Sequence, residues 1–238
     1  MNWQITNVVG ECKKINDTFK KIINLLLSAS IMGILTYGCS SSAYIRLKIS
    51  HEPFYNIIEN KREGNILVIQ FVDKRPNKYI AAFVYMFVDI FYVTEEGVKL
   101  ETLLTNYFVE ALKEVGYNVV FKEQLSGDIL SQNKYDAIIL GEIKEFWFDF
   151  PNITDTASQF YGRIRIKIKA LDPNGQNVLW EKDFTKEKHG IIPYHPLNKN
   201  SVKGIEREFR IALNDILYQA LKDFASEEFY KAIKKSKK

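Results

Sequence analysis

Apolar and polar residues alternate with a period of two between residues 162 and 170. One face carries Ile164, Ile166, Ile168 and Ala170, and the other carries the basic residues Arg163, Arg165, Lys167 and Lys169. Because successive side chains of a strand point to opposite faces, this segment is predicted to be a half-buried strand. The turn-forming residues 172–176 and the segment 178–185 then complete a β-hairpin.

Other segments also have the pattern of strands. Residues 44–49 alternate in polarity, which predicts a half-buried strand, and residues 66–72 form a nearly continuous apolar run. A run of that kind is typical of a central strand that is buried on both faces. Residues 117–121 and 135–140 are also predicted strands, and the second continues toward the aromatic cluster 146–150.

Residues 79–93 are dense in aromatic and β-branched side chains. They follow the turn-like residues 74–78, and we predict an extended, hairpin-like excursion. So many apolar groups in one stretch leave a membrane-contacting segment as the alternative.

Two segments have the period of a helix. Apolar residues recur at i, i+3 and i+4 over 98–115, where Gly116 follows as a C-cap, and over 202–224. The tail 231–238 holds five lysines and is predicted to be frayed and solvated. The fold class is therefore α+β, with a mixed, largely antiparallel sheet and two long helices packed on one face.

The amino-terminal segment has the features of a signal peptide. Lysines at 13, 14, 20 and 21 precede the apolar run 22–38, which is short for a span of about 30 Å of hydrocarbon. The run ends in Leu35-Thr36-Tyr37-Gly38-Cys39, which resembles the lipobox of bacterial lipoproteins, although Tyr37 is bulky and Leu35 lies one place further out than usual. An uncleaved signal anchor and a buried core helix are the alternatives.

The lipobox resemblance implies that Cys39 is the acylated first residue of the mature protein. Cys12 would leave with the leader, so the mature chain would hold one cysteine and no internal disulfide. The serines at 40, 41 and 42 are predicted to form a short, flexible tether, and a serine after the acylated cysteine is compatible with sorting to the outer membrane. Acylation at this position would anchor the protein stably in a lipid bilayer.

These features divide the chain into three parts: a leader at 1–38, the acylated cysteine with tether and first strand at 39–63, and a single α+β domain at 64–238 with a basic tail. Removal of the leader leaves 29 basic and 27 acidic residues, a formal charge of +2. So small a charge does not favour nucleic acid as a partner.

One set of residues resembles a known family. The segment 66–68, the turn Asp73-Lys74-Arg75-Pro76, Gly116-Tyr117 after the first helix, the strand 135–143, and the hairpin with 172–175 and Trp180 are similar in order to the YajG-like periplasmic lipoproteins. The outline is also similar to auxiliary lipoproteins of lipid-handling ABC transporters. Both resemblances imply an envelope protein, and neither implies a catalytic residue.

Two groups of residues are candidate contacts for a ligand or partner. Asp73, Lys74 and Arg75 follow a central strand, where α/β proteins often place ligand contacts, and a plain charged turn is the alternative. The basic stripe Arg163, Arg165, Lys167 and Lys169 needs acidic partners, because like charges in a row repel. Lipid phosphates could supply them, as could Glu181 and Asp183 on the next strand.

The sequence contains no catalytic signature. His51, His189 and His195 are scattered, so no metal site is expected. Glu142 and Glu145 would point to opposite sides of a regular strand. No cofactor is implied. We therefore expect a non-enzymatic binding or assembly protein, lipid-anchored and facing the periplasm from the outer membrane, with an envelope protein as partner. An auxiliary subunit of a lipid transporter, with an apolar groove at 79–93, and an unrecognised hydrolase are the alternatives.

Overall fold

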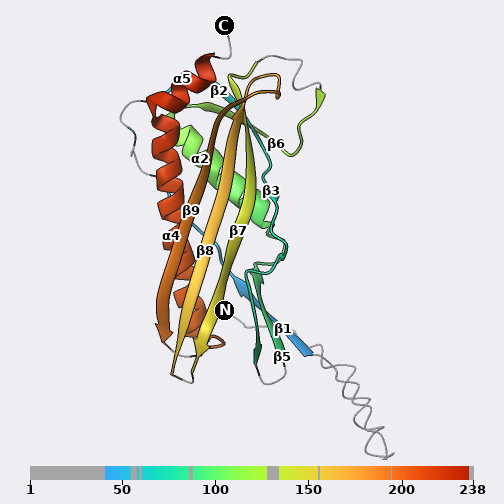
Figure 1. Ribbon diagram of the computed structural model, residues 1–238, viewed down its shortest axis with the longest axis vertical. Coiled ribbons are helices and arrows are strands. Elements are labelled where there is room, and N and C mark those ends of the chain that lie inside the picture. The colour runs from blue at the N-terminus through green and yellow to red at the C-terminus, as the bar shows by residue number, and fades with distance from the viewer. Residues whose placement is uncertain are drawn as a thin grey trace, which may run out of the picture.

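Figure 1 shows the computed structural model, which describes residues 41–54, 58, 61–85, 88–127, 134–154, 156–193 and 195–235. The leader, the predicted lipobox and Cys39 lie outside the described residues. The described strands form a long sheet and a small one, and the helices cover one side of the long sheet.

The long sheet has the order β6-β2-β7-β8-β9, with β3 paired to β7. Its strands are β2 (Asn65–Ile69), β3 (Val72–Asp73), β6 (Asn118–Lys122), β7 (Ala137–Ile153), β8 (Ala157–Leu171) and β9 (Val178–Pro193). β2 pairs in parallel with β6 and with β7, whereas β7, β8 and β9 form long antiparallel ladders. The predicted mixed, largely antiparallel α+β fold is confirmed.

The predicted central strand is buried on both faces. In β2, Ile66 and Val68 belong to the main core, while Leu67 and Ile69 pack in a second cluster. That second cluster is completed on the same sheet by Ile138 of β7. A strand with apolar neighbours on both sides has no polar positions, which explains its continuous apolar run.

The small sheet contains β1 (Ser41–Leu47), β5 (Val88–Thr94) and β4 (Ala81–Tyr85), in that order. β4 and β5 form the predicted hairpin, and β1 pairs with β5 in parallel. The sequence did not separate this sheet from the larger one. Ser41 and Ser42 lie in β1, so the predicted flexible tether is wrong for these two residues: main-chain pairing with Val88 and Asp89 orders them.

The two long helices are α2 (Leu100–Val115) and α4 (Lys199–Ala225). α4 lies along β9, and α2 packs against α4 and the parallel strands. Gly116 ends α2 at φ +112°, and its N–H donates to helix carbonyls, as the C-cap prediction requires. Both helices therefore cover one face of the sheet, as predicted.

The carboxyl-terminal prediction is partly wrong. Residues up to Lys235 continue in a further helix, α5 (Glu227–Lys235), in which Phe229 and Ile233 are fully buried. The Phe229 ring lies 5.1 Å from that of Trp180, and Lys234 reaches Asp136 at 3.4 Å. Because the lysines lie on the outer side of a short amphipathic helix, the composition of the segment does not reveal the apolar face of that helix.

β9 runs to Pro193 and is longer than the predicted strand 178–185, because β8 pairs with it over its whole length. β7 contains a register shift between Ile143 and Glu145. After this bulge Glu145 lies opposite Arg165, on the same charged face where Glu142 lies opposite Lys167. The prediction that the two carboxylates point to opposite sides is therefore wrong, because it assumed a regular strand.

Candidate functional site

One cavity lies where several strands end. β6 and β7 each pair in parallel with β2, and β3 pairs in parallel with β7, so these strands all run in the same direction. The carboxyl ends of β2, β3 and β6 lie beside the end of β5 and the start of α2. The cavity is an open crevice of about 720 Å³. It is lined by Gln70, Phe71, Val72, Asp73, Arg75, Lys78, Thr94, Val98, Lys99, Leu100, Glu101, Glu123 and Gln124. Crevices at such strand ends are common ligand sites in proteins with parallel strands.

Asp73 and Arg75 form a clasp at one side of the crevice. The Arg75 guanidinium donates from Nε to Asp73 Oδ1 at 3.0 Å and from Nη2 to Asp73 Oδ2 at 2.9 Å. Its Nη1 donates to the Phe146 carbonyl of β7 at 2.9 Å. Weaker bonds reach the carbonyls of Lys78 and Tyr79 at 3.3 and 3.4 Å. Every guanidinium nitrogen of Arg75 therefore has a protein acceptor, and the clasp ties loop 74–80 to the long sheet.

The electrostatics of the clasp keep Asp73 ionised. Burial raises the pKa of Asp73, but hydrogen bonds and charge from Arg75, together with Lys78, outweigh it and lower the pKa below the ordinary 3.8. Lys78 Nζ lies 3.3 Å from Asp73 Oδ2. A carboxylate that is held ionised in this way orders the crevice wall and is poorly suited to exchange protons near neutral pH.

The remaining polar groups of the crevice are the ones open to a partner. Lys99 is the N-cap residue of α2, Glu101 lies in the first turn of that helix and Glu123 follows β6; sequence reasoning missed all three. The Thr94 hydroxyl lines the crevice and donates a hydrogen bond to the Val98 carbonyl at 2.7 Å. Lys74, a predicted contact, is exposed but is not among the lining residues. The crevice thus offers mixed charge with exposed apolar surface at Val72.

The predicted basic stripe lies on the face of the long sheet that points away from the helices. Each of its members has an acidic partner on a neighbouring strand. Arg163 contacts Glu187 at 3.2 Å, and Arg165 contacts Asp183 at 3.1 Å. Lys167 and Lys169 share Glu181 at 2.6 and 3.3 Å. The cross-strand pairing of the stripe with Glu181 and Asp183 is therefore present in the structure.

The basic stripe and its partners Glu181, Asp183 and Glu187 form a charge ladder, in which ion pairing shifts the pKa of several members. The hydrogen bonds that Arg165 donates to Asp183 raise the pKa of Arg165, and the hydrogen bond that Lys167 donates to Glu181 raises the pKa of Lys167. In turn, Lys167 and then Lys169 lower the pKa of Glu181 despite some desolvation. The ladder is nearly neutral as a unit, so it is a weak attractor for an anionic partner.

The aromatic cluster 146–150 divides between the two faces of β7. Phe146, Phe148 and Phe150 are buried in the main core, where Phe146 stacks on Phe209 of α4 at 5.0 Å. Trp147 points to the charged face, and its ring lies 5.2 Å from that of Tyr161. The cluster is therefore core and sheet rim.

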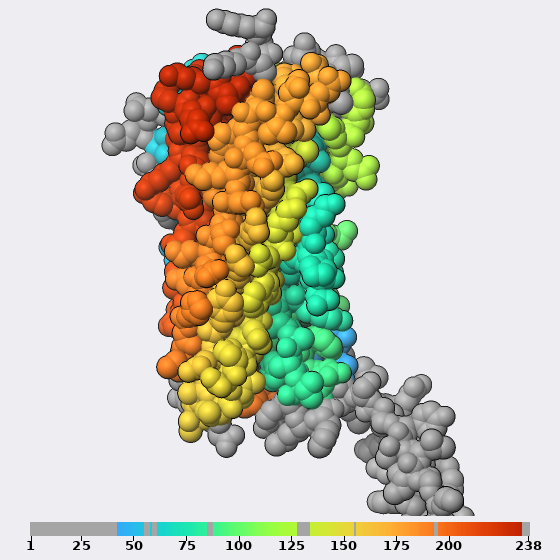
Figure 2. All heavy atoms as spheres, in the orientation of Figure 1, coloured from blue at the N-terminus to red at the C-terminus, as the bar shows by residue number. Residues whose placement is uncertain are grey.

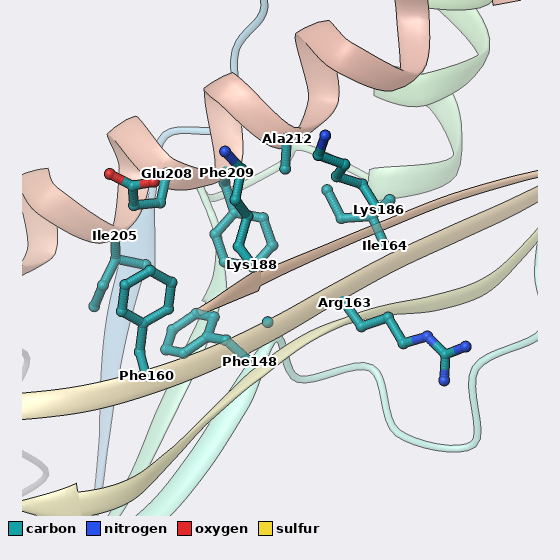
Figure 3. A pocket seen from close by; sticks show the side chains of 11 residues that line it. Phe148, Phe160, Arg163, Ile164, Lys186, Lys188, Ile205, Glu208, Phe209 and Ala212 are labelled. Atoms are coloured by element: carbon teal, nitrogen blue, oxygen red, sulfur yellow. The ribbon is translucent and has the colours of Figure 1, made fainter. Parts of the chain in front are cut away.

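A second cavity lies between α4 and the long sheet (Figure 3). Phe148, Phe160 and Phe209 surround it, with Lys186, Lys188 and Glu208 at its edge. Its volume is about 10 Å³, which is room for one water molecule at most. This cavity is a packing space beside Gly162 and holds no ligand-sized site.

The histidines lie apart. His51 Nε2 contacts Glu110 at 3.0 Å, while the ring of His189 stacks on Tyr161 at 4.4 Å. Across the described residues, no group of three or more metal-ligating side chains comes together. In that same part of the chain, no helix has the length and apolar character to cross a membrane.

Comparisons with known proteins give a fold. No protein-family model matches the chain, and no curated protein matches its sequence. A solved Helicobacter pylori structure, described as a neuraminyllactose-binding hemagglutinin homologue, is similar with a TM-score of 0.54 and 12% identity over 77% of this chain and 97% of that one. The chain shares its fold with this protein.

Two further solved structures are more distant. A Xanthomonas campestris protein has a TM-score of 0.44 and 13% identity, over 76% of this chain and 93% of that one. A Neisseria meningitidis lipoprotein has a TM-score of 0.37 and 14% identity, over 65% and 98%.

Proposed function

We propose that this protein is a membrane-anchored envelope lipoprotein, of the kind represented by the YajG-like proteins, and that it acts as a non-enzymatic binding or assembly partner. Acylation of Cys39 supplies the anchor, and the domain faces the periplasm from the outer membrane. The apolar run that ends in Gly38-Cys39 supports the anchor. The protein that shares the fold is described as a homologue of a neuraminyllactose-binding hemagglutinin, which is compatible with a binding role.

The observation that carries the binding role is the crevice at the strand ends. It is large enough for a peptide segment or a small polar ligand, and the Asp73–Arg75 clasp holds one wall in place. Lys99, Glu101 and Glu123 lie around the opening. Mixed charge beside the exposed Val72 suits a protein surface or a polar ligand better than a lipid chain.

The transporter alternative called for an apolar groove lined by residues 79–93. The side chains of Ile80, Ile90 and Tyr92 are instead buried in the main core. The hydrolase alternative called for polar groups that converge in a pocket, and the crevice meets that condition. However, its described lining has neither histidine nor cysteine, and the Thr94 hydroxyl is engaged.

The binding role is tested by photo-crosslinking in living cells. A photoreactive amino acid replaces Lys99, an exposed residue of the crevice, and the matched control replaces Lys113, which is exposed at the far end of the same helix. We expect a discrete crosslinked species from position 99 and none from 113. Equal crosslinking at both positions, or none at 99, contradicts binding at the crevice.

A further inference from the structure

The two most exposed large hydrophobic side chains among the described residues are Val84 and Ile191, at 69% and 68%. They come from different sheets, since Val84 lies in β4 and Ile191 near the end of β9. Side chains as apolar and as exposed as these are costly in water when several gather at one place. Their positions in the fold therefore decide whether they form one surface.

Both side chains lie at the same end of the molecule. Val84 is one residue before Tyr85, which pairs with Val88 at the tip of the β4–β5 hairpin. Ile191 pairs with Gln159 close to the turn between β7 and β8. Phe83, next to Val84, contacts Phe150 near the end of β7 with 5.5 Å between ring centroids. Figures 1 and 2 show the end of β4 and the start of β5 at the lower end of the molecule, together with the end of β7 and the start of β8.

The proposed lipid anchor starts from this same end. Ser41 opens β1 and pairs with Val88, so the strand begins beside the β4–β5 tip. Cys39 precedes Ser41 by two residues. An extended chain covers about 3.3–3.6 Å per residue, so two residues of chain reach at most about 7 Å from Ser41. An anchor that short holds this end of the domain against the bilayer.

Away from this end, the aliphatic side chains are followed by aromatic rings and then by paired charges, with Asp89 opposite Val84 and Asp149 opposite Tyr161 as the acids among them. Beyond the aliphatic Val84 and Ile191 come rings on the outer faces: Phe91 between Tyr44 and Tyr79 on the small sheet, at 5.5 and 4.2 Å, and the Trp147–Tyr161 pair on the long one. The charge ladder starts two residues further along β8, at Arg163. Tyr and Trp favour the interface between hydrocarbon and water, and charges favour the water beyond it.

We propose that this end of the domain lies on the lipid bilayer, with Val84 and Ile191 in contact with acyl chains and the aromatic side chains at headgroup depth. The inference rests on the proposed acylation of Cys39. It assigns the β4–β5 tip and the end of β9 to the membrane. The crevice partner would then bind a domain whose orientation on the membrane is fixed.

The test measures lipid contact in the full-length lipoprotein, purified from membranes and reconstituted in phosphatidylethanolamine–phosphatidylglycerol vesicles. An environment-sensitive fluorophore is attached to Val84→Cys, and separately to Ile191→Cys. Val178→Cys is the matched control, because Val178 is 53% exposed and starts β9 at the opposite end of the long sheet. Acylation leaves Cys39 without a thiol, so the parent protein should not take up the label.

For a side chain inserted to a depth of about 5–10 Å, nitroxide-bearing lipids should quench the fluorophore at 84 and 191 at least about twofold more than at 178. Equal quenching at the three positions overturns the proposal. A blue shift at 84 and 191 without quenching by the lipid nitroxide also overturns it, because a protein then covers these residues.

Failure of the anchor is seen separately. If the parent protein takes up label at Cys39, Cys39 is not acylated. The proposed orientation of the domain on the membrane is then also wrong, because it rests on that acylation. If the parent stays unlabelled and the three positions quench equally, the anchor stands and only the proposed orientation is wrong.

Discussion

Substitution of Arg75 by methionine tests whether the clasp holds the crevice together. Arg75 is 7% exposed and joins Asp73 to the Phe146 carbonyl, so Arg75→Met leaves a buried carboxylate and a carbonyl without their donor. Breaking a buried ion pair costs on the order of 3–5 kcal/mol. Because Lys78 stays 3.3 Å from Asp73, we expect a loss near the lower limit, about 3 kcal/mol. Urea unfolding, followed by tryptophan fluorescence, measures it.

The pH dependence identifies the cause. The lowered pKa of Asp73 means that its ion pair stabilises the wild type fully above the ordinary 3.8 and less as pH falls through the lowered value. In Arg75→Met, burial would raise that pKa, so the free-energy difference should be largest at neutral pH and shrink in acid. Lys78→Met removes an exposed contact to the same carboxylate and should cost at most about 1 kcal/mol. An equal loss in both variants, or a loss independent of pH, refutes the reasoning.

Three further substitutions test other parts of the fold by the same unfolding assay. Phe229→Ala should cost about 3–5 kcal/mol of unfolding free energy, because the buried ring packs on Trp180. The control Lys231→Ala, on the outer side of α5, should change it by less than about 0.5 kcal/mol. Similar losses in the two variants would mean that α5 is not docked on the domain. Gly141→Ala places a methyl group 2.4 Å from the Phe71 ring and should cost about 1–3 kcal/mol of unfolding free energy. The control Gly127→Ala meets nothing within 4 Å and should leave stability unchanged. An unchanged stability in Gly141→Ala would contradict the close contact between Gly141 and Phe71. Glu181→Gln removes an acid whose pKa is held below 4.5 by Lys167 and Lys169. The urea midpoint of the variant should therefore lie below that of the wild type at neutral pH, and the two midpoints should converge in acid. A difference in midpoint that stays constant with pH would contradict this pairing.

The sequence predicted the elements whose side chains follow one period throughout. β8 alternates isoleucine with basic residues because one face meets the core and the other meets acids of β9. The helix ended by Gly116 was predicted for the same reason, since its apolar stripe and its cap are both local. Pairing of the stripe with Glu181 and Asp183 was also within reach, because a hairpin fixes which residues face each other.

Other features depend on contacts between distant segments. The bulge that brings Glu145 to the charged face is a local irregularity with no periodic signal. The crevice arises because the ends of β2 and β6 meet the start of α2, so Lys99 and Glu123 join Asp73 only in the folded chain. Phe229 and Ile233 are four residues apart, as on one face of a helix, but the five lysines of the tail led to the prediction of a frayed segment.

The most direct test of the lipoprotein assignment is the mass of the amino-terminal peptide, from protein isolated in membrane fractions. The account predicts a mature chain that begins at Cys39 and carries a diacylglycerol group, and its absence in Cys39→Ala. A peptide that still begins at Met1, with an unmodified Cys39, would contradict the account and make residues 1–38 an uncleaved anchor.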